Sequence, residues 1–404
     1  MAEWQTVRLG EIVKTNQSTY SPKENWQFVN YLDTGNITMN KIDEIQYINT
    51  AKDKLPSRAR RKVKTNSIIY STVRPNQLHY GVIKEQPDNF LVSTGFTVID
   101  VNYDKAVPDF IYYALTKEEV TEQLQAIAEQ SVSAYPSLKP SDIENLEFML
   151  PDKKTQERIV AILRSIDEKI KENNAINNNL EQQYISIVDN LLSKLTQYKI
   201  YSLLEVADCQ NGRAFYKEGY DPNGAFVIDL GNVNTSGNFV RTAADKYISL
   251  DRYKEPKLEK YRVYKNDIVM VMTDRKSTME LLGKVGKIYK DGYYLLNQRM
   301  YRIRAKEGIN TNYLYACLNS TETSNFLKRK ALGSVQKYVN TGEINSIEIK
   351  VPSSEKMEEI ASILDPIFLQ MESNILENES LNELRDILLP KLMSGELDVS
   401  GIDL

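Results

Sequence analysis

The chain of 404 residues has little of the chemistry on which most enzymes depend. It contains one histidine, His79, and two widely separated cysteines, Cys209 and Cys317. A single histidine argues against a histidine-based triad, a zinc centre or a histidine acid–base pair. No GxxxxGK phosphate loop ending in Ser or Thr occurs, so nucleotide hydrolysis by that route is excluded. We therefore predict no catalytic residue and no metal site in this chain.

Long apolar runs are also missing. The opening residues, MAEWQTVRLGE, lack the apolar stretch of a secretion signal, and nowhere do 18 apolar residues follow one another. The two isolated cysteines show neither metal-ligand spacing nor a disulfide framework, which suits a reducing compartment. These absences predict a cytoplasmic protein without a membrane partner.

What the sequence does contain is a repeat with a period of about 200 residues. LPDKKTQERIVAILRSID (150–167) matches VPSSEKMEEIASILDPIF (351–368), and DNLLSKL (189–195) matches DILLPKL (386–392). Between such landmarks the two halves differ almost completely. A chain duplicated in this way usually folds as two similar halves related by a pseudo-twofold axis. That symmetry suits a partner that is itself nearly twofold, and duplex DNA is the commonest example.

The length and the repeat together predict the domain organisation. A chain of this size is expected to form two domains of ordinary size with connecting helices. The predicted segments are a first globular domain (1–150), a central helical region (151–198), a second globular domain (199–351), a distal helical region (352–398) and a tail (399–404).

Apolar residues at steps of three and four predict a long helix in each helical region, with the narrow apolar seam of a coiled-coil pair. In the first helix the seam is expected at Ile159, Leu163, Ile166, Ile170, Leu180, Tyr184, Ile187 and Leu191. In the second it is expected at Ile360, Leu364, Ile367, Met371, Leu381, Leu384, Leu388 and Leu392. No other segment is long and apolar enough to cover either seam, so we expect the two helices to pack together, antiparallel. About 40 residues would hold the globular domains on the order of 60 Å apart.

A proline interrupts the second helical pattern. Pro366 in a helix interior would cost about 3 kcal/mol. If Asp365 is an N-cap and Pro366 is the first helical residue, this cost disappears. We therefore expect a short helix, roughly 354–364, followed by a separate long helix.

The globular halves are predicted to be mixed α/β. β-Branched and aromatic enrichment predicts strands at 67–73, 80–83, 96–101, 267–273, 283–289 and 293–304. Helices are expected at 109–129 and 311–330, where each would close its domain.

The net charge of −4 hides an uneven distribution of basic residues. Between Lys52 and Lys64 there are seven basic residues and one acidic residue, a pattern typical of phosphate contact. The candidates for backbone contact are Arg58, Arg60, Arg61 and Lys62 and, in a lysine- and tyrosine-rich stretch of the second half, Arg275 and Lys276. The alternative is ordinary solvated surface charge.

Candidate base-reading residues follow predicted strands. A turn at Pro75 could direct side chains into a DNA groove, where Arg, Asn and Gln suit base edges. The candidates are Arg74, Asn76, Gln77 and His79 in the first half, and Gln298, Arg299, Gln336, Lys337 and Tyr338 in the second. For Arg74 the alternative is a pairing with a carboxylate inside its own domain.

Several segments resemble the specificity subunit of Type I restriction–modification enzymes. They are LPDKKTQERIVAILRSIDEKI (150–170), LRDILLPKLMSGEL (384–397), WQTVRLGEIV (4–13) and SIIYSTVRPN (67–76). The resemblance covers essentially the whole chain in order: recognition domain, helix, recognition domain, helix. One departure is that the second copy has MEEI (357–360) where the first has QERI (156–159).

The resemblance implies a function. Each globular half would be a target recognition domain that reads one part of a split double-stranded DNA sequence. The chain would recruit two modification subunits that bind S-adenosylmethionine and methylate adenine and, through them, restriction subunits that use ATP and magnesium. The chain itself would bind no cofactor. Two other classes stay open from the residues: a coiled-coil scaffold that never touches DNA, against which the 52–64 cluster speaks, and an enzyme with an unrecognised site.

Overall fold

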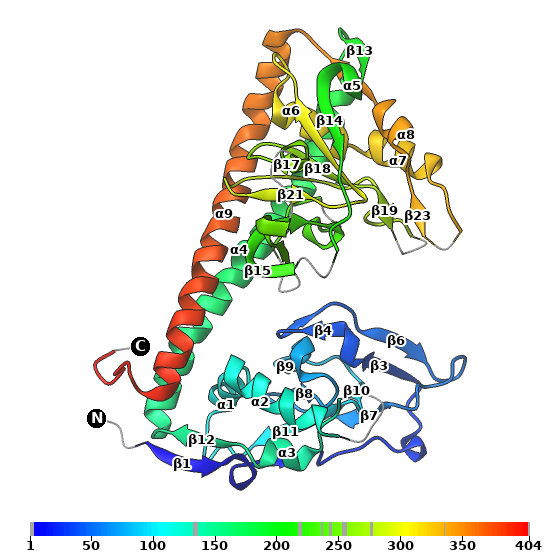
Figure 1. Cartoon of the computed structure of the whole chain (residues 1–404). Coiled ribbons are helices and arrows are strands. Elements are labelled where there is room, and N and C mark those ends of the chain that lie inside the picture. The colour runs from blue at the N-terminus through cyan, green and yellow to red at the C-terminus, as the bar shows by residue number, and fades with distance from the viewer. Residues whose placement is uncertain are drawn as a thin grey trace. The chain divides into compact units, whose positions relative to one another are not determined.

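The computed structural model describes residues 4–131, 136–216, 220–235, 237–241, 245–252, 257–274, 278–334 and 336–402. The chain forms two compact units (Figure 1). Unit 1 comprises residues 1–170 and 379–404, and unit 2 comprises residues 171–378. Unit 1 is therefore built from both ends of the chain, whereas unit 2 is one continuous segment.

Unit 1 contains two four-stranded sheets. The central sheet has the order β2 (Val13–Thr15), β11 (Phe96–Val101), β8 (Ile68–Ser71) and β9 (Tyr80–Val82). The outer sheet has the order β6 (Gln46–Asn49), β3 (Phe28–Leu32), β10 (Phe90–Ser93) and β7 (Ala59–Lys62). Only the β3–β10 pair is parallel among the described neighbours in these sheets. Short antiparallel pairs join β1 (Gln5–Arg8) to β12 (Glu147–Leu150) and β4 (Ile37–Thr38) to β5 (Lys41–Ile42).

Unit 2 repeats both four-stranded sheets in the same strand order. Its central sheet has the order β14 (Ala207–Asn211), β22 (Met300–Ala305), β18 (Ile268–Val271) and β20 (Val285–Lys287). Its outer sheet has the order β16 (Lys246–Ile248), β15 (Tyr220–Ile228), β21 (Tyr294–Leu296) and β17 (Arg262–Val263), again with one parallel pair, β15–β21. Two-stranded pairs join β13 (Lys199–Ser202) to β24 (Glu348–Val351) and β19 (Thr273–Asp274) to β23 (Lys337–Tyr338).

The central strands form where the sequence is continuously apolar. All four residues of β8 and all four of β18 are buried, because each strand lies inside its sheet and is covered on both faces. Asn66 and Asn266 precede these strands with φ of 69° and 71°. Asparagine tolerates this left-handed conformation better than other side chains with a β carbon.

The helices confirm the mixed α/β prediction, although two predicted helices are each divided. The segment expected as 109–129 forms α1 (Pro108–Leu115) and α2 (Glu118–Glu129), and 311–330 forms α6 (Thr311–Asn319) and α7 (Thr321–Lys330). The chain breaks at Ser320, which caps α7 by accepting a hydrogen bond from Thr323 N. Short helices α3 (Pro140–Glu144), α5 (Leu203–Val206) and α8 (Thr341–Asn345) complete the units.

The expected strand at 293–304 is likewise two strands. β21 ends at Leu296 and β22 begins at Met300, and the two belong to different sheets. The chain turns between them at Arg299, whose φ is 69°. A left-handed residue cannot continue a strand, and the apolar enrichment on both sides concealed the turn.

The two long helices are α4 (Lys153–Ser193) and α9 (Ser354–Ser394). In unit 1 the early part of α4 packs with the late part of α9, since Ile159, Leu163 and Leu392 share one core. In unit 2 the late part of α4 packs with the early part of α9, since Tyr184 and Leu364 share the other. Both pairings are antiparallel, as predicted.

Most predicted seam residues are inside these cores. The fully buried ones are Ile159, Leu163, Ile166, Tyr184, Ile360, Leu364, Met371 and Leu392. The partly buried ones are Ile170, Leu180, Ile187, Leu191, Ile367, Leu381 and Leu388. Leu384 is wrong, because its side chain is 44% exposed and Arg385 lies on the inner side, within 3.2 Å of Asp167.

Between the two apolar ends, the helix contact in unit 2 is polar. Asn177 Oδ1 accepts a hydrogen bond of 2.8 Å from Asn374 Nδ2, and Asn174 Oδ1 accepts one of 3.1 Å from Asn378. Asn173 donates to Glu377 Oε2 at 2.8 Å. A buried amide pair costs stability and fixes register, so these contacts set the pairing of residues near 174 with residues near 378.

The predicted break at Pro366 is wrong. α9 runs through Pro366 without interruption, and the proline lies on the exposed face of the helix. Its neighbours Leu364 and Phe368 are 0% and 4% exposed in the core of unit 2. Burying two large apolar side chains yields about 1.5–3 kcal/mol each, which offsets the cost of proline.

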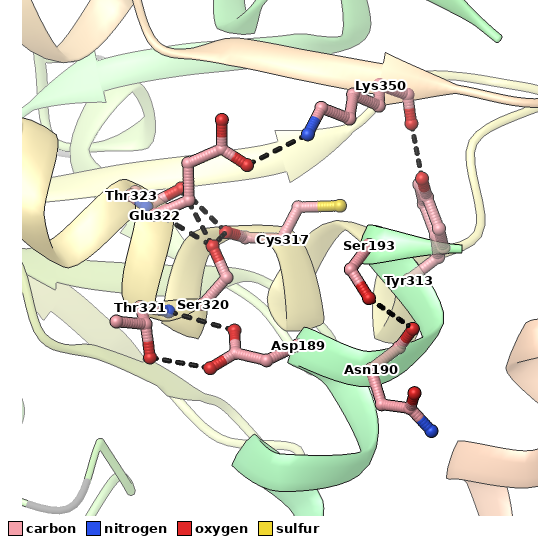
Figure 2. Close-up of polar contacts among 10 residues, drawn as sticks. All are labelled: Asp189, Asn190, Ser193, Tyr313, Cys317, Ser320, Thr321, Glu322, Thr323 and Lys350. Carbon is pink, nitrogen blue, oxygen red and sulfur yellow. Dashed lines mark hydrogen bonds and ion pairs between the residues drawn. The ribbon is translucent and has the colours of Figure 1, made fainter. Parts of the chain in front are cut away.

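The repeated DNLLSKL motif fastens α4 to the globular part of unit 2 (Figure 2). The Asp189 carboxylate accepts hydrogen bonds from Thr321 N at 3.1 Å and Thr321 Oγ1 at 2.6 Å, at the start of α7. An acidic group stabilises a helix N-terminus because it meets unpaired N–H groups and the positive end of the dipole. In the same region, Lys350 of β24 and Glu322 of α7 form an ion pair of 2.9 Å.

Candidate nucleic-acid interface

The base-reading candidates gather at one end of each central sheet. This end, called the loop end below, is where β8 ends and β11 begins in unit 1, and where β18 ends and β22 begins in unit 2. Residues 72–79 connect β8 to β9 there, and residues 297–299 connect β21 to β22. The loop end is built from short connections on a rigid sheet, which is where recognition residues usually lie.

In unit 1 the candidates lie on a tight turn. Arg74 and Leu78 have φ of 51° and 57° and flank the short 3-10 helix Pro75–Gln77. Arg74, Asn76 and Gln77 are exposed. The turn is held because Asn76 N donates to Gln125 Oε1 of α2 at 3.2 Å. Non-glycine residues in the left-handed region are strained, and such strain is concentrated at functional sites.

His79 is less available than predicted. It is half-buried, and its Nδ1 lies 2.6 Å from the carbonyl oxygen of Ile37 and 3.3 Å from Thr38 Oγ1. A ring nitrogen this close to a carbonyl oxygen must carry a hydrogen and donate it to that oxygen. His79 therefore braces the β4 strand against the turn, and only its other nitrogen remains for a ligand.

The four basic residues at 58–62 do not form one surface. Strand alternation places Arg60 and Lys62 on one face of β7 and Arg61 on the other. The Nε of Arg61 is buried, and burial lowers the pKa of its guanidinium. Lys62 forms an ion pair with Glu24 and lies over the Trp26 ring, 5.1 Å from its centre. Arg58 is the exposed member, and its carbonyl accepts a hydrogen bond from Thr94 beside the loop end.

In unit 2 the structure brings separate candidates together. Arg299 Nη1 donates to Gln336 Oε1 at 2.7 Å, although the two residues are 37 positions apart. Gln298 and Arg299 are exposed on the β21–β22 turn, and Lys337 and Tyr338 form β23 beside β19. Arg275 and Lys276 lie outside the described residues.

A cleft of about 430 Å³ opens at this loop end. Besides Arg299, Gln336 and Tyr338, its lining includes polar residues that the sequence reasoning missed, among them Asn211, Asn340 and Thr341. Gly212 also lines it, and a β carbon there would lie 1.7 Å from the Asn297 carbonyl oxygen. Only glycine lets β14 approach the 297–299 turn so closely.

A sequence signal for the loop end existed in a second repeat. LDTGNI (32–37) and IDLGNV (228–233) follow the equivalent strands β3 and β15. In unit 1 the Thr34 methyl would lie 2.8 Å from a β carbon at Gly95, on the loop end. In unit 2 Asp229 accepts from Gly231 N at 2.9 Å and pairs with Lys246. These turns support the loop ends from the outer sheet.

Other kinds of site are scarce. The described residues hold no group of three or more His, Cys, Asp and Glu side chains arranged to bind a metal ion. Among those same residues, every helix falls short of the length and apolar character that a membrane crossing requires.

Comparison with known proteins places this architecture in a family. The model of the Type I restriction modification DNA specificity domain matches residues 1–182 and 196–385. The chain is 26% identical to the HindI specificity subunit of Haemophilus influenzae, over 98% of this chain and 100% of that one. It is 22% identical to the MjaIX specificity subunit of Methanocaldococcus jannaschii, over 74% and 71% of the two chains.

A solved structure supports the fold. The crystal structure of the S subunit of a Type I restriction–modification system from M. genitalium matches with a TM-score of 0.52 and 15% identity, over 99% of this chain and 97% of that one.

The chain belongs to the Type I restriction modification DNA specificity family. Members of this family are the recognition subunits of Type I restriction–modification systems, and they have no catalytic role of their own. The resemblance stated from the sequence motifs is thereby confirmed.

Proposed function

We propose that this chain reads a two-part double-stranded DNA target, one part with the loop end of each unit. The observation that carries the proposal is that the two four-stranded sheets occur in the same order in both units, with different side chains at equivalent positions. A repeated backbone supplies two similar docking frames, and different side chains supply two different sequence preferences. Exposed Arg58 would contact a phosphate, whereas Arg74, Asn76, Gln77, Gln298 and Arg299 would face base edges.

The chain would deliver this recognition to catalytic partners in the cytoplasm. Two modification subunits would carry S-adenosylmethionine and methylate adenine, and restriction subunits with ATP and magnesium would join through them. α9 offers a docking face, because it exposes Ile363 and Leu369 in its unit 2 part and Leu384 and Ile387 in its unit 1 part. In α4, Ile176 is the one large apolar side chain that is exposed.

Methylome sequencing tests the proposal directly. The chain would be expressed with its modification subunits in a host that lacks adenine methylation. We expect one motif with two defined parts, a gap of fixed length, and adenine methylation in each part. A single uninterrupted motif would contradict the two-reader arrangement. If methylation depends on the partners but not on this chain, the proposed function is wrong.

The docking face has its own test. Leu369→Ser and Ile387→Ser together should reduce copurification of the modification subunits, because each removes an exposed apolar contact. Ile176→Ser on α4 is the matched control. Equal losses in both variants would show that docking does not favour α9.

The helix pair is proposed to set the gap between the half-sites. Four residues inserted after Asn174 and four after Glu377 would keep the Asn174–Asn378 pairing level and lengthen each helix by about 6 Å. At about 3.4 Å per base-pair step, the gap should widen by one or two base pairs while both half-sites stay unchanged. Insertion in α4 alone is the control, since it would shift the seam and reduce stability. A constant gap with altered half-sites would refute this role.

A further inference from the structure

The backbone at Arg299 is strained. Its φ of 69° lies in the left-handed region, which is unfavourable for a side chain with a β carbon. The equivalent position in unit 1 is Gly95, whose φ lies outside the left-handed region. Met272 N donates to the Arg299 carbonyl in unit 2, and Thr72 N donates to the Gly95 carbonyl in unit 1. Position 299 therefore carries a large side chain in a left-handed conformation, whereas the equivalent position in unit 1 has a glycine that does not adopt this conformation.

The two loop ends also differ in the room that they leave. In unit 1 the Thr34 methyl would contact a side chain at position 95, and Ser137 occupies the place that Tyr338 holds in unit 2. In unit 2 the cleft opens at the corresponding place, with Arg299, Gln336 and Tyr338 in its wall. Arg299 replaces Gly95, and Tyr338 replaces Ser137.

The Arg299 guanidinium is positioned by a neutral partner. The one described side chain to which it donates is the neutral amide of Gln336, at 2.7 Å. By contrast, Arg304 on the following strand donates to both carboxylate oxygens of Asp267, each at 2.7 Å. An amide acceptor fixes the plane of a guanidinium and leaves its positive charge and its remaining N–H groups available.

From this geometry we propose that Arg299 reads a guanine in the half-site recognised by unit 2, with Gln336 as its positioning residue. The inference rests on the proposed function and assigns one base to one side chain. A guanidinium donates two parallel hydrogen bonds to O6 and N7 of guanine in the major groove, a pattern that no other base offers. Gln336 would hold the guanidinium in the plane that this contact needs.

A purely structural pair makes a different prediction. If the Arg299–Gln336 hydrogen bond only braced the loop before β23, its loss would lower stability and weaken binding to all sequences alike. If Arg299 met a phosphate, its loss would weaken binding uniformly and reduce the salt dependence. Only a base reader changes the preference at one base pair.

The experiment uses the full chain with its modification subunits in limiting amount, acting on genomic DNA without adenine methylation, followed by sequencing of modified sites. Arg299→Ala should reduce discrimination roughly five- to hundredfold at one G·C pair of one half-site. Arg299→Lys keeps the charge but loses the fork, so it should relax the same pair. Gln336→Leu should relax that pair too, by a smaller factor. The other half-site should stay unchanged in all three variants.

Arg329→Ala is the matched control, because Arg329 is an exposed arginine at the end of α7 in the same unit. It should leave the preference at every position unaltered. Two results would overturn the proposal. In the first, one wild-type half-site lacks a G·C pair and the Arg299 variants relax no pair in the other half-site. In the second, Arg299→Lys keeps full discrimination. If Arg299→Ala abolishes modification altogether, Arg299→Lys decides. Absence of any two-part motif for the wild-type chain would instead refute the proposed function.

Discussion

The same junction between helix and globular domain is built with opposite chemistry in the two units. In unit 1, Asp109 of α1 accepts hydrogen bonds from Arg164 of α4 at 2.6 Å and Lys84 at 2.8 Å. In unit 2, Asn312 occupies the place of Asp109 and donates to Asp365 of α9 at 2.6 Å. Asp365 in unit 2 stands where unit 1 has Arg164, and Asn312 stands where unit 1 has Asp109, while the backbone arrangement is the same.

A second exchange occurs in the central sheets. In unit 1, Ser67 donates to Asp100 at 2.6 Å, and at the equivalent positions in unit 2 Asp267 accepts from Arg304. Each set satisfies its own hydrogen bonds, so neither unit depends on the residues of the other. The shared fold therefore fixes the backbone and the buried positions, but the polar residues at those positions can differ. Two domains that recognise different sequences need this freedom.

The sharpest test of this comparison concerns the helix ends. Leu392 and Leu195 match in the repeat, and they are 2% and 9% exposed in the cores of unit 1 and unit 2. Leu392→Ala should destabilise unit 1 by about 2–5 kcal/mol, and Leu195→Ala should destabilise unit 2 by a similar amount. Hydrogen exchange resolved by unit measures both.

Leu384 supplies the control for that pair. Its side chain is 44% exposed on the same helix as Leu392, so Leu384→Ala should change stability by no more than about 0.5 kcal/mol. If Leu392→Ala loosened unit 2 instead of unit 1, the assignment of the late part of α9 to unit 1 would be wrong.

Transplanting the polar junction should have a smaller effect. Asp109→Asn leaves Lys84 and Arg164 without a carboxylate, but their side chains are 42% and 46% exposed, so solvent screening limits the loss to about 1 kcal/mol. Asn312→Asp places a second carboxylate beside Asp365, but Lys287 already donates to Asn312 at 2.9 Å and would partly offset the repulsion, so the cost should be smaller. The double variant Asn312→Asp with Asp365→Arg rebuilds the chemistry of unit 1 and should recover stability. Denaturant unfolding measures the stability of each variant. A double variant less stable than Asn312→Asp alone would show that these polar residues cannot be exchanged between the units.

The smallest expected effect separates two basic residues of one cluster. Arg58 is exposed, whereas Lys62 is paired with Glu24 and packed on Trp26. Arg58→Ala should lower the slope of log K against log salt by about 0.9, the value for one phosphate contact. Lys62→Ala should leave that slope nearly unchanged. Titration of DNA binding at several salt concentrations measures both, and an unchanged slope for Arg58→Ala would remove Arg58 from the interface.

Much of the fold could be predicted because the repeat marks equivalent residues. Ile159 and Ile360, or Leu163 and Leu364, identify the apolar seam in both copies. The pairing of the two helices in the middle of the seam could not be predicted, because its buried residues Asn173, Asn177 and Glu181 are polar and carry no hydrophobic signal. Periodicity wrongly favours Leu384 over Arg385 as an inner residue, because apolar residues occur on several faces of α9 and do not show which face is inside.

The candidate site was found only as separate pieces. Arg299 and Gln336 were each predicted as base-reading residues, but their contact depends on the order of strands in the sheet, which local pattern does not reveal. The division of the basic cluster at 58–62 depends on Glu24 and Trp26, which are far away in sequence. The sequence thus predicts which residues suit DNA contact, whereas the contacts of each side chain can be identified only in the folded structure.

The discontinuity of unit 1 has a consequence for biosynthesis. Its core includes Leu392, Met393 and Val399 near the end of the chain, and a β carbon at Gly395 would touch the Trp4 ring. During translation these residues emerge from the ribosome after all of unit 2, so the domain made first must wait with an open apolar face. Unit 2 needs only residues 171–378 and can finish folding earlier. The domain that is second in the sequence is therefore expected to complete its fold first. A released chain truncated before Leu392 should protect unit 2 from protease while unit 1 is cut.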